Sequence, residues 1–201
     1  MSGDLEYGYG DDPDTVAETV RLAASVGLVG CSIEDFTGDR SRTIYEKSHA
    51  VERVRAAVEA ARALPFPFTL TARAENFLRG RPDLDDTIER LRAFEAAGAD
   101  VLYAPSLPDL AAIRRVCESV TRPVNVMVGP RNQCFPVRDL VAVGVRRISL
   151  GPTFLRAAMT AFLSAAREVR EHGTFEFAVN AVTFGELNAL MAPKGTLERS
   201  G

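Results

Sequence analysis

The sequence predicts an α/β fold, a (β/α)8 barrel of the TIM type of which about six βα units are present. Short apolar, β-branched stretches alternate along the chain with longer segments of helical periodicity, at a spacing of roughly 25 to 40 residues. Polar residues that suit a site follow the strands, as they do at the carboxyl ends of barrel strands. A doubly wound open sheet is the alternative, although no Gly-x-Gly-x-x-Gly turn follows a strand to support it.

Each expected element follows from its periodicity and from the residue that ends it. The first helix has apolar residues at Val16, Ala17 and Val20 and stops at Gly27, a typical helix-ending glycine. Strands are expected at the amino terminus, where Asp4 and Glu6 lie, and over residues 28–33, 68–72, 100–103, 124–128 and 147–150. Helices are expected over residues 14–26, 48–63, 83–97, 110–120, 136–143 and 153–172, with a short one over 184–191.

Composition excludes several classes of protein. A net charge of −3 shows no lean toward nucleic acid or an anionic membrane surface, so neither is expected as a partner. No apolar run approaches the ~18 residues of a membrane helix, and the amino terminus lacks a signal-peptide pattern. Cys31, Cys117 and Cys134 are scattered, which is typical of reduced thiols in the cytoplasm. Cys31 lies inside an apolar strand and is expected to be a core residue.

The chain is expected to form a single barrel domain over residues 1–201 that is incomplete at the amino terminus. A closed barrel has about eight strands and typically ~250 residues, whereas about six strands are found here. The βα pattern after Asp4 has no gap, so the deficit is expected to lie before Asp4.

Two carboxylates leave the first strand together. Asp4 and Glu6 are two residues apart, so their side chains point to the same side of an extended strand. A Gly-Tyr-Gly turn follows, and Glu34 ends the next strand. Oxygen ligands of this kind suit Mg²⁺ or Mn²⁺, so Asp4, Glu6 and Glu34 are candidate metal ligands. The alternative for Asp4 and Glu6 is a solvated chain end.

Arg73 follows a buried strand and precedes Glu75, which favours a site role over a surface position. Tyr103, like Ser106, is at the same end of its strand and is a candidate for substrate contact. Arg40 and Arg42, in the loop over residues 36–46, are candidates to bind an anionic substrate, or are simply solvated.

Several motifs together resemble the phosphoenolpyruvate mutase/isocitrate lyase superfamily. They are Asp-Leu-Glu-Tyr-Gly-Tyr-Gly over 4–10, Gly-Cys-Ser-Ile-Glu-Asp over 30–35, Ala-Arg-Ala-Glu over 72–75, Ala-Gly-Ala-Asp over 97–100, Gly-Val-Arg-Arg-Ile-Ser-Leu-Gly-Pro over 144–152 and Phe-Gly-Glu-Leu-Asn over 184–188. They occur in the family's order and spacing over nearly the whole chain.

The resemblance implies a Mg²⁺-dependent barrel enzyme, forming a dimer or tetramer, that acts on small 2-oxo or enol carboxylates. It implies metal-site roles for Asp4, Glu6 and Glu34, and catalytic roles for Arg73 and Glu34. Arg73, Tyr7, Gly8, Glu75 and Tyr103 are then the substrate-binding residues. A cation and a guanidinium together stabilise the negative charge of a forming pyruvate enolate.

The loop after Glu34-Asp35 departs from part of the family. Isocitrate and methylisocitrate lyases carry a Lys-x-Cys-Gly-His loop there, and residues 36–45 contain no lysine, cysteine or histidine. Those two activities are therefore not expected. The expected function is C–C cleavage of a 2-oxo or 2-hydroxy carboxylate, with P–C bond chemistry as one alternative. A truncated, inactive partner subunit is the other.

Overall fold

The computed structural model describes residues 1–39, 41, 43–129 and 134–192, so Arg40 and Arg42 lie outside the described residues. The chain divides into two compact units, Met1–Thr153 and a second that begins at Phe154. The strands of the first unit are β1 Gly3–Asp4, β2 Gly30–Glu34, β3 Thr69–Arg73, β4 Val101–Tyr103, β5 Val124–Met127 and β6 Arg147–Ser149. Its helices are α1 Pro13–Ser25, α2 Lys47–Arg62, α3 Leu84–Ala96, α4 Leu110–Ser119 and α5 Val137–Ala142.

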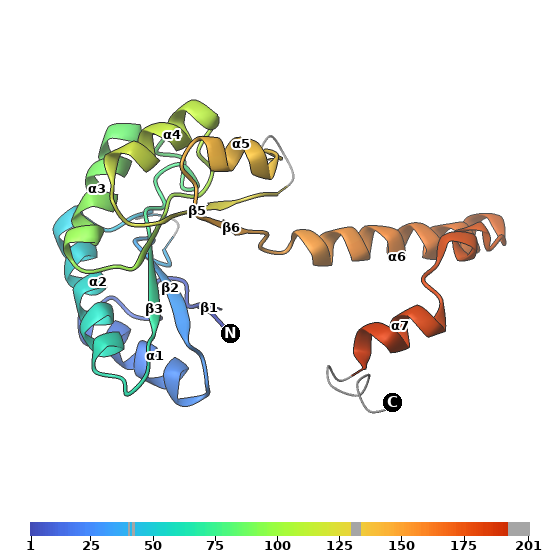
Figure 1. The fold of residues 1–201 in the computed structure, drawn as a ribbon, viewed down its shortest axis with the longest axis horizontal. Coiled ribbons are helices and arrows are strands. Elements are labelled where there is room, and N and C mark those ends of the chain that lie inside the picture. The colour runs from blue at the N-terminus through green and yellow to red at the C-terminus, as the bar shows by residue number, and fades with distance from the viewer. Residues whose placement is uncertain (40, 42, 130–133, 193–201) are drawn as a thin grey trace, which may run out of the picture. The chain divides into compact units, whose positions relative to one another are not determined.

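The six strands form one parallel sheet in the order β1-β2-β3-β4-β5-β6. Each helix packs on the next, α1 on α2, α2 on α3 and α3 on α4, and Figure 1 shows α2 and α3 along the same side of β2 and β3. A doubly wound sheet places helices on both faces and changes strand order at a switch point. The uninterrupted order with helices on one side is instead that of a curled half-barrel, as in TIM-type folds.

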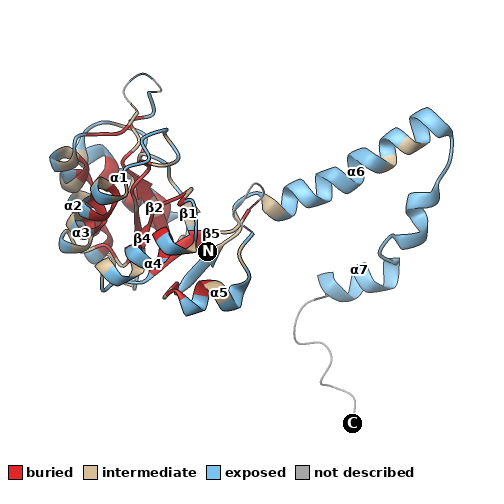
Figure 2. Ribbon diagram, turned by 90° about the horizontal axis from the view of Figure 1, so that it is seen from above, coloured by how far each residue is buried: buried red, intermediate tan, exposed pale blue. Residues whose placement is uncertain are grey.

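The two faces of the sheet differ in polarity because side chains alternate along each strand. The residues of the helix-facing side are apolar and buried, and Figure 2 shows that the buried ribbon lies where the sheet meets α1–α4. They are Cys31, Ile33, Leu70, Ala72, Leu102, Val124 and Val126. Burial raises the pKa of Cys31 to about 12, so this thiol is a packing residue, as expected. The opposite face carries polar side chains: Ser32, Thr71, Arg73, Asn125 and Ser149.

Local hydrogen bonds decide where the elements begin and end. The strand expected from residue 28 begins at Gly30, because Leu28 still belongs to the end of α1. The amide of Leu28 donates to the carbonyl of Ala23 at 3.1 Å. The amide of Gly27, a residue with φ 93°, donates to the carbonyl of Ala24 at 3.0 Å. Asp12, Asp83 and Asp109 cap α1, α3 and α4, each accepting a backbone N–H in the first turn.

The second unit is helical. It contains α6 Thr153–His172, which starts at the boundary residue, a 3₁₀ turn over Glu176–Asn180 and α7 Phe184–Met191. Thr183 and Glu186 form a capping box at the start of α7. None of the residues of α6 or α7 is buried. Within the described residues, no helix combines the length and apolar character needed to cross a bilayer.

Candidate functional site

Three of the expected site residues lie in one row across neighbouring strands. Glu34 on β2 is in register with Arg73 on β3, and Arg73 is in register with Tyr103 on β4. Each ends its strand, so the carboxyl edge of the parallel sheet brings together side chains that are far apart in the sequence.

The guanidinium of Arg73 is at the centre of this row. It lies 2.8 Å from Asp4 Oδ2, 3.0 Å from Glu34 Oε2 and 2.8 Å from Glu75 Oε1. Its Nε also donates to Glu75 Oε1 at 3.1 Å, and its carbon lies 5.1 Å from the ring centre of Tyr103. The contacts fix the plane of the guanidinium and hold its positive charge in place before a substrate binds.

The charges of the cluster shift the ionisation of its members. Burial lowers the pKa of Arg73, but the carboxylates of Glu75, Glu34 and Asp4 outweigh it and hold that pKa above its ordinary value. Burial, and next the charge of Glu75, raise the pKa of Glu34 to about 7, although Arg73 opposes the rise. Arg73 therefore stays charged, while Glu34 is within reach of a proton near neutral pH.

Asp35 anchors the end of β2 beneath the site. Its Oδ1 accepts the backbone N–H of Glu75 at 2.8 Å, and its Oδ2 lies 3.1 Å from Arg90 on α3. Arg90 also pairs with Asp86 at 2.8 Å and donates to the carbonyl of Tyr45 at 2.8 Å. This buried network joins β2, β3 and α3 and holds the row in place.

Arg79 was not expected at the site from the sequence. It lies 3.3 Å from Glu34 Oε1 and 3.3 Å from Glu75 Oε2, and it stacks 3.5 Å over the ring of Phe36. The sequence feature that could have indicated Arg79 is its position four residues after Glu75, because side chains at that spacing meet on a helical turn.

Two hollows open beside Arg73, and Asp4 and Arg73 line both. One of about 440 Å³ is also lined by Glu6, Glu34, Phe36, Gly38 and Arg79. The other, of about 360 Å³, lies over the polar face of the sheet and includes Tyr103, Asn125 and Arg147. Both are large enough for a small carboxylate substrate.

The loop after β1 places the remaining expected residues. Glu6 lines the larger hollow and is exposed, and its carbonyl accepts the N–H of Glu34 at 2.9 Å. The ring of Tyr7 lies against Gly38, where an added Cβ would come within 2.8 Å of it. Gly8 is buried against Val16 with φ 73°, a turn position. Glu75 is fully buried and contacts both Arg73, at 2.8 Å, and Arg79, at 3.3 Å.

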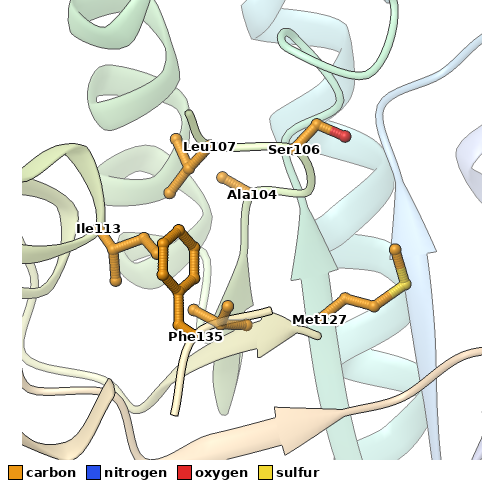
Figure 3. A pocket seen from close by; sticks show the side chains of 7 residues that line it. Ala104, Ser106, Leu107, Ile113, Met127 and Phe135 are labelled. Carbon is orange, nitrogen blue, oxygen red and sulfur yellow. The ribbon is translucent and has the colours of Figure 1, made fainter. Parts of the chain in front are cut away.

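A third hollow, of about 10 Å³, lies beside the end of β4 (Figure 3). Apolar side chains such as Leu107, Ile113 and Phe135 line it, with Ser106 at one side. A space of this size holds a single water molecule at most. The candidate site therefore comprises the two larger hollows.

The donor set around Asp4 fits a hard divalent cation. Among the residues that the structure describes, no three acidic, cysteine or histidine side chains are grouped tightly enough to hold a metal ion by themselves. Mg²⁺, however, usually keeps several waters and binds through one or two carboxylates. Asp4, Glu6 and Glu34 offer carboxylate oxygens to one hollow.

The fold and site define an α/β half-barrel with an acidic and guanidinium site at the carboxyl edge of its strands. Residues 1–170 match the model of the phosphoenolpyruvate phosphomutase family. The chain belongs to this family, within the phosphoenolpyruvate mutase/isocitrate lyase superfamily. Family members are lyases or mutases.

Three relatives illustrate the similarity. A crystal structure of a Burkholderia cenocepacia J2315 protein, provisionally named a lyase/mutase, is 54% identical with a TM-score of 0.93, covering 96% of this chain and 69% of that one. The 2-methylisocitrate lyase of Escherichia coli K12 is 32% identical over 60% of this chain and 42% of its own length. The oxaloacetate decarboxylase of Marinomonas sp. MWYL1 is 26% identical over 83% of this chain and 58% of its own length. The chain thus spans about half the length of these two curated relatives.

Proposed function

We propose that the protein is a Mg²⁺-dependent lyase that cleaves a C–C bond in a small 2-oxo or 2-hydroxy carboxylate through an enolpyruvate-like intermediate. The observation that carries the proposal is the Arg73 guanidinium, oriented by three carboxylates beside two hollows at the carboxyl edge of the sheet. The similarity to a methylisocitrate lyase and to an oxaloacetate decarboxylase supports the reaction class.

Arg73 has the properties that the reaction needs. C–C cleavage next to a 2-oxo group leaves negative charge on the oxygens of the pyruvate fragment, and a fixed cation stabilises it without reorganising. Glu34 and Glu75 already hold the guanidinium in a largely buried position. The Arg73 side chain therefore loses little further conformational freedom during the reaction. Tyr103 faces the same cation and would line the substrate hollow.

Asp4, Glu6 and Glu34 are the residues that would hold Mg²⁺ or Mn²⁺, in part through water. When bound, the cation would polarise the substrate's oxo oxygen as a Lewis acid. Asp4 and Glu34 would also hold Arg73 at the site, since both contact its guanidinium.

P–C bond chemistry is the second candidate function. The family model that matches residues 1–170 is that of a phosphoenolpyruvate phosphomutase, and phosphonopyruvate also gives a pyruvate enolate when its P–C bond breaks. The loop over residues 36–45, which lacks the Lys-x-Cys-Gly-His sequence of some lyases, is compatible with either reaction.

The test is a substrate panel with purified protein and Mg²⁺. Oxaloacetate, 2-methylmalate and 2,3-dimethylmalate represent C–C cleavage, and phosphonopyruvate and phosphoenolpyruvate represent P–C chemistry, with product formation followed by NMR. Turnover of a C–C substrate that EDTA abolishes is the expected result. Turnover confined to the phosphorus compounds would establish the second candidate, and turnover of neither group by folded, Mg²⁺-bound protein would contradict both.

Replacing Glu34 by alanine is expected to weaken Mg²⁺ binding at least about tenfold, or ~1.4 kcal/mol, because one carboxylate of the site is lost. Isothermal titration calorimetry on the wild-type and variant proteins measures the difference. Glu18→Ala, which removes an exposed carboxylate of α1 that pairs with Arg21 in the same helix, is the control. Equal affinities for Glu34→Ala and the control would remove Glu34 from the metal site.

We also infer that the protein is a homo-oligomer, with α6 as a contact surface for a second copy. Large apolar side chains on α6 are exposed, among them Leu155, Met159 and Phe162, which are spaced at four and three residues and share one face. Light scattering is expected to give a multiple of the 21.8 kDa chain mass. Leu155→Ser combined with Phe162→Ser should lower that mass, whereas Arg170→Ser on the same helix should not. A wild-type monomer would contradict the inference.

A further inference from the structure

Arg53 on α2 is a buried arginine whose hydrogen bonds all go to one loop. The residue as a whole is only 1% exposed. The guanidinium donates to the carbonyls of Gly10 at 2.5 Å and Asp11 at 2.6 Å, and also to that of Tyr7. Burial lowers the pKa of Arg53, because removal from water disfavours the charged form of the guanidinium. A buried charge of this kind persists only when strong hydrogen bonds compensate it.

The loop that Arg53 holds has an unfavourable backbone. Glu6 and Tyr9 have φ angles of 49° and 59°, in the left-handed region that residues other than glycine avoid, and Gly8 between them has φ 73°. Such conformations cost free energy and persist only where the surroundings determine them. Three carbonyls gripped by one planar cation are a restraint of that kind.

Side chains around Arg53 restrain the same loop. The Tyr45 hydroxyl donates to Asp11 Oδ1 at 2.5 Å, and the Arg53 guanidinium carbon lies 4.4 Å from the centre of the Tyr45 ring. His49 Nε2 lies 2.9 Å from the Asp11 carbonyl oxygen. Tyr45, His49 and Arg53 therefore all hold the same loop, and none of them lines the hollow that Glu6 lines.

The held loop leads directly into the candidate site. The carbonyl of Glu6, the first of the left-handed residues, accepts the N–H of Glu34 at 2.9 Å, and the Glu6 side chain lines the same hollow as Asp4. A change of backbone at Glu6 would move its carboxylate and would release the hydrogen bond to Glu34.

We propose that Arg53 is a positioning residue that holds the loop from Glu6 to Asp11, with its three left-handed residues, in the observed conformation, so that the Glu6 carboxylate faces the metal and substrate site. Arg53 acts through Glu6 and does not itself touch the hollow. The role of the site in this inference rests on the proposed function. The contacts by which Arg53 holds the loop do not depend on it.

The test compares Arg53→Lys and Arg53→Met with Arg55→Lys, a control at an exposed arginine of the same helix. Lysine keeps the charge but cannot reach three carbonyls with a planar fork. Hydrogen–deuterium exchange follows the amide of Gly8, which donates to Leu5 at 2.8 Å, and the amides of β3 as a reference for the fold. Calorimetry with Mg²⁺ and the kcat for the best substrate of the panel provide the functional measurements.

Both Arg53 variants are expected to speed exchange of the Gly8 amide at least about tenfold and to weaken Mg²⁺ binding about fivefold, with β3 exchange unchanged. Tyr45→Phe, which removes the hydroxyl bond to Asp11, should give a smaller shift in the same direction and provides the test if Arg53→Met does not fold. Unchanged Gly8 exchange in Arg53→Lys would overturn the proposal. Faster exchange with wild-type Mg²⁺ affinity and kcat would also overturn it, because Arg53 would then serve the fold alone. If the wild-type protein binds no Mg²⁺ and has no turnover, the proposed function fails, while Gly8 exchange still decides whether Arg53 fixes the loop.

Discussion

Replacing Arg73 by alanine is expected to lower kcat about 100- to 1,000-fold, the usual effect of removing one preorganised donor to a developing negative charge. Charge on the substrate oxygens grows toward the transition state, so the loss should fall on kcat more than on KM. The close carboxylates at 2.8 to 3.0 Å keep the guanidinium charged and oriented before substrate arrives. Steady-state kinetics with the substrate found in the panel measures the effect.

Arg73→Lys separates charge from geometry. Lysine keeps the positive charge among Asp4, Glu34 and Glu75 and so preserves the local balance, but it loses the two-pronged contact, and only part of the activity should return. Arg21→Ala, at an exposed arginine of α1, is the control. If Arg73→Ala raised KM and left kcat intact, Arg73 would bind the ground state only, and the enolate role would be wrong.

Replacing Arg90 by leucine is expected to lower the free energy of unfolding by about 3 to 5 kcal/mol, the cost of breaking a buried ion pair by removing one partner. Asp35 is buried and would lose the cation 3.1 Å from its Oδ2, and the Tyr45 carbonyl would lose its donor. Burial already raises the pKa of Asp35 to about 6, so its charge depends on such partners. Urea denaturation followed by circular dichroism measures the change.

Arg115 provides the matched comparison. Its guanidinium pairs with Asp85 on the surface, where both side chains are more than half exposed. Arg115→Leu should therefore change the unfolding free energy by less than about 1 kcal/mol. Similar values for the two leucine variants would show that the Arg90 network adds no more stability than an ordinary surface pair.

The sequence predicted the fold well because its strongest signals are local. Helical periodicity and terminal glycines such as Gly27 mark each βα unit, and the parallel arrangement follows from their alternation. The row of Glu34, Arg73 and Tyr103 was predictable for the same reason, since each residue ends a strand. The structure brings Asp4, Glu34 and Glu75 to Arg73, but it does not by itself test the roles predicted for them.

The buried arginines could not be predicted in the same way. Arg53 and Arg90 lie on amphipathic helices, where a basic residue is most often solvated, and their hydrogen-bond partners outside their own helices are 42 to 55 positions away in the sequence. Arg79 is close to Glu75 in sequence, but its contact with Phe36 depends on how two loops meet. The left-handed backbone at Glu6 is equally invisible in the sequence, because glutamate has no preference for that conformation.

The uninterrupted strand order has a consequence for how the sheet assembles. Every pairing joins strands that follow one another in the chain, with separations from 22 residues, as for Leu102 and Val124, to 39 residues, as for Gly30 and Thr69. Loop-closure entropy grows only with the logarithm of that separation, so the extreme pairings differ by about 0.5 kcal/mol. Among the six strands that the structure describes, no pairing has to wait for a distant strand, and each of these βα units can add to the one before it during synthesis.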